Sequence, residues 1–193
     1  MLRLFANLGF RWKIALPILL LAFLLLLMGV LGMQGITQVA DSSNKLATRY
    51  LPAISVLLNA DRDLYQAQVA ERSLLDEPVG DHVGDLMATH SENIQQAYDR
   101  VHKYAAMKPS SAALDLVTQF DRGFERWKAT TQKVVQLASS DPDAASALSF
   151  GDSASQFESM RDAIDKLGQL EDEAANAEGA DAIALGDKLT WQQ

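Results

Sequence analysis

The chain has 193 residues and no cysteine, which excludes disulfide scaffolds and metal or redox sites built on cysteine. Its 17 Lys+Arg stand against 25 Asp+Glu, and only 14 of the basic residues follow Met33. This excess of negative charge, with no basic patch, argues against nucleic-acid binding.

The first feature along the chain is an apolar run. Residues Ile14 to Met33 are 20 consecutive positions without a charged side chain. As a helix rising 1.5 Å per residue, this run is about 30 Å long, the thickness of a bilayer's hydrocarbon core. Basic residues precede the run, and no acidic residue occurs before Asp41. This asymmetry predicts a cytoplasmic N-terminus and export of the following part.

The alternative is a cleaved signal peptide, whose apolar region is shorter and ends at a small-x-small site. Here the run is longer and leaves through residues 29–34 without such a site. We therefore expect an uncleaved anchor in a bacterial inner membrane. The expected organisation is a cytoplasmic segment at 1–13, a transmembrane helix at 14–34 and a periplasmic domain at 35–193. A second membrane crossing and a cytoplasmic signalling part are expected beyond Gln193.

Beyond Met33 the apolar spacing is helical. In the first exported helix, two sets of residues recur at intervals of seven or its multiples and predict a buried seam: Ile36, Tyr50, Leu57 and Leu64, and Val39, Leu46, Ala53, Ala60, Ala67 and Leu74. Pro52 interrupts the backbone ladder of this helix and is expected to bend it slightly. The helix should end at residues 76–80, a cluster of helix breakers.

Three further helices follow, each with an apolar seam. The predicted seam residues are Val83, Met87, His90, Ile94, Ala97, Val101 and Tyr104; then Val117, Phe120, Phe124, Trp127, Thr131, Val134 and Ala138; and finally Phe150, Phe157, Met160, Ile164 and Leu167, continuing to Ile183, Leu185 and Leu189. Ser110 is expected near the start of the third helix, and Asp141-Pro142 at that of the fourth. Four amphipathic helices with short connections predict an all-α fold, an antiparallel up-down four-helix bundle continuing from the membrane helix.

A second stripe flanks the seam of the first exported helix at a spacing of three and four. It begins and ends with apolar residues but is polar in its middle: Leu51, Ile54, Leu58, Asp61, Tyr65, Gln68, Arg72 and Leu75. Arg72 offers a carboxylate a bidentate partner, while Asp61, Tyr65 and Gln68 suit an amine or a hydroxyl. The stripe therefore predicts a site for a small polar or anionic ligand. The alternative is that these residues form salt bridges within the bundle or at a dimer interface.

Three other charged residues could contribute either to this ligand site or to the surface. Arg62 and Asp63 are expected on the outer faces of their helix as solvated charges, although Arg62 could reach the pocket of a second copy. Arg161, beside the seam of the fourth helix, is either a surface residue with a buried stem or a second clamp for an anion.

The chain shows no pattern typical of catalysis. His82, His90 and His102 include no pair at the i, i+4 spacing of a helical metal site, and His90 is expected to be a hydrogen-bonded core residue. There is no glycine-rich phosphate loop, no nucleophile motif and no catalytic triad in a credible context. We predict no enzyme activity, no metal and no cofactor.

The motifs that point to a family are Arg49-Tyr50-Leu51-Pro52, residues 59–67 (NADRDLYQA) and residues 71–75 (ERSLL). The chain resembles the sensing half of bacterial methyl-accepting chemotaxis receptors. The resemblance implies a homodimer through the first helix, with a ligand such as an amino acid, an organic acid or an inorganic anion at the interface. It also implies output through the cytoplasmic part to a chemotaxis kinase and its adaptor. The arginines do not match the family's pattern residue by residue.

Two other interpretations remain open at this level. The chain could be the input domain of a membrane sensor histidine kinase, which the sequence after Gln193 would decide. It could also be a membrane-tethered structural bundle that binds only proteins, in which case Asp61, Gln68 and Arg72 should be satisfied internally.

Overall fold

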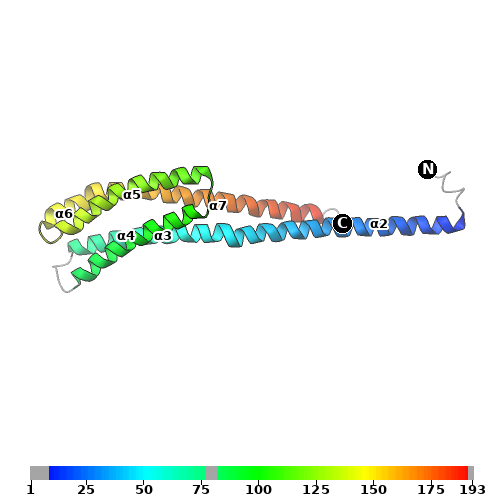
Figure 1. Cartoon of the computed structure of the whole chain (residues 1–193), viewed down its shortest axis with the longest axis horizontal. Helices are drawn as coiled ribbons and strands as arrows, with labels where there is room; N and C mark the ends of the chain where they lie inside the picture. Colours follow the sequence, from blue (N-terminus) through cyan, green and yellow to red (C-terminus); the bar gives the residue numbers. More distant parts are fainter. Residues whose placement is uncertain (1–8, 77–81, 191–193) are drawn as a thin grey trace. The chain divides into compact units, whose positions relative to one another are not determined.

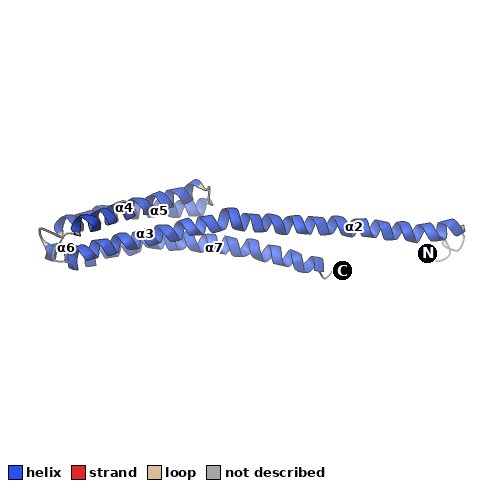
Figure 2. Cartoon of the chain, turned by 90° about the horizontal axis from the view of Figure 1, so that it is seen from below, coloured by secondary structure: helices blue, strands red, loops and turns tan. Residues whose placement is uncertain are grey.

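The structure, a computed structural model, describes residues 9–76 and 82–190, with side chains as far as residue 184. Helices account for all regular secondary structure of this part, which confirms the all-α prediction (Figure 2). The chain divides into two compact units: Met1–Lys45 with Ala177–Gln193, and Leu46–Asn176.

The first unit contains α2, Phe10–Lys45. It is long and apolar enough to cross a membrane, and none of its apolar window is buried against protein. Exposing so long a run of leucines to water is energetically unfavourable. The helix is therefore suited to lipid. In the same unit, Ser42 donates a hydrogen bond of 2.7 Å to Glu178, and Lys45 forms a salt bridge of 3.1 Å with that carboxylate.

The second unit begins with a π-helical turn, η1, Leu46–Tyr50, directly before α3, Leu51–Asp76. Pro52 explains this turn, because proline lacks an N–H and its ring clashes with the carbonyl four residues earlier. A π turn contains one residue more than an α turn and so takes up the misfit.

The π turn also moves the buried seam by one position. Counting back from Tyr50 in sevens predicts burial at Ile36, but Ile36 and Val39 are exposed, whereas Gly35 and Ser42 are buried. The prediction for Ile36 and Val39 was therefore wrong. A count in sevens assumes α-helical turns throughout, and it fails here because η1 adds one residue between these positions and Tyr50.

The rest of the second unit is the bundle. Its further elements are α4, Val83–Ala106; α5, Ser111–Leu137; α6, Pro142–Leu148; the π turn η2, Ser149–Ser153; and α7, Ala154–Thr190, which ends in the first unit. One view pairs α3 with α4 and α5 with α7 (Figure 1), and the view from below pairs α3 with α7 and α4 with α5 (Figure 2). The four long helices therefore pack as a four-helix bundle, as the sequence predicted.

Hydrogen bonds at two helix starts confirm the predicted boundaries. Ser110 accepts a bond of 3.2 Å from the amide of Ala113, and Asp141 accepts one of 3.1 Å from Ala144, with Pro142 in the first turn. These side chains satisfy N–H groups that have no partner within their own helix.

Aromatic rings connect all four helices across the core. Edge or tilted contacts run from Tyr98 through Phe124, Trp127 and Phe157 to Tyr65, with ring centres 5.1–6.3 Å apart. Such pairs add about 0.5–1.5 kcal/mol each beyond burial. The third predicted seam is buried throughout.

Two predicted seam residues of the bundle unit are also exposed. Phe150 lies in the middle of η2, where the extra residue buries Ser149 and Ser153 and turns the ring outward. Met87 is exposed and lines a groove of about 650 Å³ between α4 and α5. Ile183 in the first unit is also exposed, while the side chains of Leu185 and Leu189 lie outside the described ones.

The packing of α5 on α7 generates the first prediction. A Cβ on Gly123 would lie 3.1 Å from the Cβ and 3.2 Å from the Cα of Met160, so Gly123→Ala forces two backbones apart. We expect it to lower the free energy of unfolding by about 1–3 kcal/mol. Thermal unfolding of the chain in detergent, followed by circular dichroism, measures this change.

Gly168→Ala is the matched control, because nothing lies within 4 Å of its added Cβ. Alanine should there stabilise α7 by up to about 1 kcal/mol through its higher helix propensity. A Gly123→Ala protein as stable as the parent would contradict the close packing.

Candidate functional site

The predicted ligand residues fall into separate groups, of which the first joins α3 to α7. Arg161 donates a hydrogen bond of 2.6 Å from Nε to Asp61, and its guanidinium lies 4.8 Å from the centre of the Tyr65 ring. The hydrogen bond to Asp61 raises the pKa of Arg161 further, so its charge is permanent. The structure thus brings Asp61, Tyr65 and Arg161 together, but the arginine is already neutralised by a carboxylate.

A groove of about 270 Å³ adjoins this group on the α3–α7 face. Three carboxylates line it, those of Asp61, Asp165 and Asp172, together with apolar side chains such as Leu58. Its described lining residues include three acidic side chains and no basic one, and Arg161 lies beside Asp61, so the groove has an excess of negative charge. Its field disfavours an anion and favours an ammonium group.

Arg72 forms the second group, towards the other end of α3. Its guanidinium lies 5.1 Å from the centre of the Phe150 ring, and its Nε is buried with no hydrogen-bond partner among the described residues. Gln68, one turn before it, is buried. At 1.5 Å per residue, Arg72 lies about 16 Å along the helix from Asp61. One small ligand therefore cannot contact both groups within a single copy of the chain.

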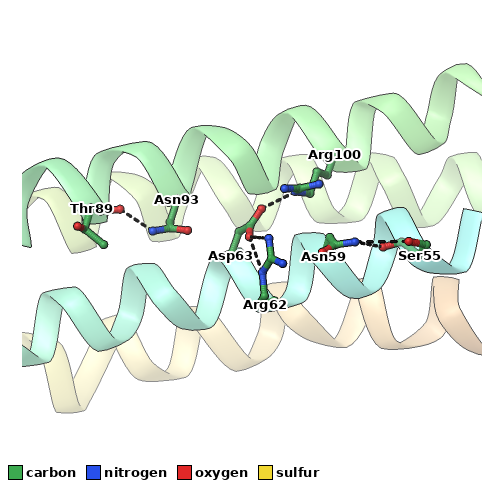
Figure 3. Close-up of polar contacts among 7 residues, drawn as sticks. All are labelled: Ser55, Asn59, Arg62, Asp63, Thr89, Asn93 and Arg100. Carbon is green, nitrogen blue, oxygen red and sulfur yellow. Dashed lines mark hydrogen bonds and ion pairs between the residues drawn. The ribbon is translucent and has the colours of Figure 1, made fainter. Parts of the chain in front are cut away.

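Asp63 corrects the prediction that it and Arg62 are solvated surface charges. The Asp63 side chain is 0% exposed and accepts hydrogen bonds from Arg62 at 2.7 Å and from Arg100 of α4 at 2.5 Å (Figure 3). Arg62 itself is half exposed. Asp63 is buried because a third column of α3, with Val56 and Ala70, also faces the core. The Arg62 charge is thus partly neutralised by Asp63 within the bundle.

Sequence reasoning missed a buried polar cluster around Glu71. This carboxylate is 1% exposed and accepts hydrogen bonds from the hydroxyls of Thr131 on α5, of Ser149 and of Ser153, the last at 3.3 Å. The π turn η2 places both serines on the same side of the chain, towards Glu71. Three hydroxyl donors thus satisfy one buried carboxylate. Glu71 follows Leu57 and Leu64 at intervals of seven residues, and this spacing could have predicted that Glu71 is buried.

His90 extends this cluster to α4, and its predicted role as a hydrogen-bonded core residue is confirmed. Its Nε2 lies 2.7 Å from the hydroxyl oxygen of Thr131. Since Thr131 donates its own proton to Glu71, Nε2 of His90 is assigned as the donor to Thr131. Burial lowers the pKa of His90 from 6.5 to about 4, so the ring is neutral in the folded protein at pH 7.

The described residues contain no group of three or more His, Asp or Glu side chains that could hold a metal ion. Hydrogen bonds and ion pairs within the bundle account for Asp61, Arg62 and Arg161. What the α3–α7 face offers to an external molecule is Arg72 with Gln68, and the acidic groove.

The comparisons with known proteins agree with this architecture. A family model described as a four helix bundle sensory module for signal transduction matches residues 7–185. The family is one of sensory modules rather than of enzymes. No curated protein matches the chain.

The pKa of His90 gives the second prediction. The unfolded chain takes up a proton near pH 6.5, whereas folded His90 resists it down to about pH 4. The contribution of neutral His90 to the free energy of unfolding is therefore fully present above pH 6.5. It is lost as the pH falls from 6.5 to 4, which lowers the free energy of unfolding by about 3 kcal/mol. His90→Gln should remove this part of the pH dependence of the unfolding midpoint in denaturant titrations.

His102→Gln is the control, since His102 is 40% exposed and lies 3.0 Å from Asp121 at the surface. Its pH profile should keep the decline between pH 6.5 and 4. An unchanged profile in His90→Gln would show that burial of this imidazole does not govern the acid sensitivity.

Proposed function

We propose, from the premise that this chain belongs to the four-helix-bundle sensory modules of methyl-accepting chemotaxis proteins, that it senses a small anionic ligand. The family assigns it to signal transduction, and the apolar α2 helix indicates a membrane protein. In our proposal residues 1–13 lie in the cytoplasm, 14–34 cross the inner membrane and the bundle lies in the periplasm. The basic residues before the apolar run support this orientation.

The observation that carries the ligand proposal is the state of the arginines on the α3–α7 face. Arg62 bonds to Asp63, and Arg161 bonds to Asp61. Arg72 instead has a buried Nε without a partner in the described chain and stacks on the exposed Phe150 ring. A buried donor without a partner costs about 1–3 kcal/mol, which a bound carboxylate or inorganic anion would recover. Arg72 is thus the primary anion contact, with Gln68 beside it.

Exposed side chains on α3 support dimerisation through this helix. Leu51, Leu58 and Tyr65 recur every seven residues on its outer face, and each is more than a third exposed. Arg72 occupies the next position of the same series. A parallel pair of α3 helices would bury these apolar side chains and bring the two Arg72 guanidiniums near the axis. Such like charges repel, and an anion between them favours the dimer. Asp61, Arg62, Tyr65 and Arg161 lie about 10–16 Å further along the same face, so in our proposal they border the anion site without contacting the anion at Arg72.

Signalling follows from differential affinity. A ligand that binds two helix arrangements unequally shifts the equilibrium between them, and a ligand that binds both equally changes nothing. In our proposal the shift passes through α7 to a cytoplasmic part that contacts a chemotaxis kinase and its adaptor.

The test of the ligand site starts with a thermal-shift screen of amino acids, organic acids and inorganic anions against the chain in detergent. Arg72→Gln should weaken binding of a stabilising anion at least tenfold, because it removes the charged donor. Arg126→Gln, an exposed arginine of α5, is the matched control and should bind as the parent does. Equal affinity of Arg72→Gln and the parent would exclude Arg72 as the anion contact.

The dimer is tested with single cysteines, since the chain has none of its own. Leu58→Cys on the outer face of α3 should form a disulfide-linked dimer on mild oxidation in membranes, seen on a non-reducing gel. Leu114→Cys on α5, which is also exposed, should remain monomeric. Equal cross-linking at both positions would argue against an interface through α3.

A further inference from the structure

A second cavity lies inside the bundle unit, at the end where α3 begins. It has a volume of about 260 Å³ and a mainly apolar wall, with two charged groups and a phenol hydroxyl among the polar groups around it. The apolar side chains are those of Pro52, Ala53, Met107 and Pro109, and the polar groups are those of Arg49, Tyr104 and Glu171. The remaining lining residue, Thr48, belongs with Arg49 to the π turn η1.

Glu171 supplies a negative charge to this cavity. Its side chain is 7% exposed, and the hydroxyl of Tyr104 donates a hydrogen bond of 2.6 Å to Oε1. Burial, and then the bond to Glu171, raise the pKa of Tyr104, so this hydroxyl keeps its proton and remains a donor. A carboxylate has about four acceptor positions, and Tyr104 fills one of them. Glu171 therefore retains acceptor capacity for an ammonium group.

Arg49 supplies the opposite charge at the rim. Its guanidinium lies 5.1 Å from the centre of the Tyr50 ring, and it forms no salt bridge with a described residue. Its charge nevertheless acts on Tyr104. The cavity thus has a buried acid and an exposed base, and no ion pair joins the two. A buried carboxylate without a cationic partner is costly, and a ligand cation would offset this cost.

We propose that this cavity binds a small zwitterion with an apolar body, its ammonium group on Glu171 and its carboxylate on Arg49. The apolar body would lie against Pro52, Met107 and Pro109. Neither a pure cation nor a pure anion fits as well, because each would lie close to one group of its own charge. A volume of about 260 Å³ suits a molecule of the size of a small amino acid.

This site is separate from the anion site at Arg72. The two arginines are 23 positions apart on the same helical segment, about 34 Å at 1.5 Å per residue. The zwitterion site also lies within one copy of the chain, whereas the anion site lies on the outer face. A molecule in this cavity contacts η1 directly and stabilises the π turn.

The test is calorimetric titration of the whole chain in detergent micelles with L-valine, and with the two molecules that carry one of its charges, isobutylamine and 3-methylbutanoate. L-Valine should bind at least tenfold more tightly than either. Glu171→Gln keeps an acceptor for Tyr104 but loses the charge, and should weaken L-valine binding at least tenfold. Arg49→Gln, at an exposed position where a folding defect is not expected, should do the same.

Arg72→Gln separates this proposal from the anion site and should leave L-valine binding unchanged. Loss of L-valine binding in Arg72→Gln with no change in Arg49→Gln would overturn the proposal and place the ligand on the outer face. Absence of saturable L-valine binding, or equal binding of L-valine and isobutylamine, would overturn it as well. If Glu171→Gln fails to fold by circular dichroism, Arg49→Gln decides.

Discussion

The constraint on which the bundle depends is that three carboxylates among its described residues are buried, and each must find its donor on another helix. Asp63 bonds to α4, Glu71 to α5 and η2, and Glu171 to α4. A buried carboxylate without such bonds is several kcal/mol less favourable, whereas aliphatic side chains tolerate a shift along their neighbours. Sliding one helix by a turn would break these bonds even if the apolar seam closed again. The polar contacts therefore fix the register that the apolar seam alone leaves loose.

Two π turns determine which positions of the chain are buried. Each lies beside a different one of these carboxylates. The turn η1 precedes Pro52 and lines the cavity that contains Glu171; η2 places Ser149 and Ser153 on Glu71. Each turn adds a residue and moves the buried positions by one. The same insertion that buries two serines turns the Phe150 ring outward, where it stacks on Arg72. The polar core and the candidate anion site thus share one local cause.

The charges of the bundle separate into those used for folding and those available to a ligand. Arg100, Arg161 and part of Arg62 neutralise carboxylates, and removing them would leave a buried or half-buried anion unpaired. Arg72 and Arg49 have aromatic neighbours but no carboxylate among the described residues. An aromatic face holds a guanidinium in place without neutralising it. These two arginines can therefore bind an anionic group without breaking the fold; Arg49 lies in η1, just before α3, and Arg72 near the end of α3.

The sequence alone determined the all-α class, the membrane-type apolar helix, the helix starts at Ser110 and Asp141 and most of the core, because these depend on local periodicity and capping chemistry. It also placed Asp61 and Tyr65 on one face of α3, where both contact Arg161. The tertiary structure decided which charges pair, because pairing depends on distances between helices that no spacing within one helix encodes. It placed Asp63 inside and bonded Arg161 to Asp61. It also revealed the π turns, which explain why a count in sevens failed at Ile36 and Phe150, since one inserted residue rotates a helix face by about 100°.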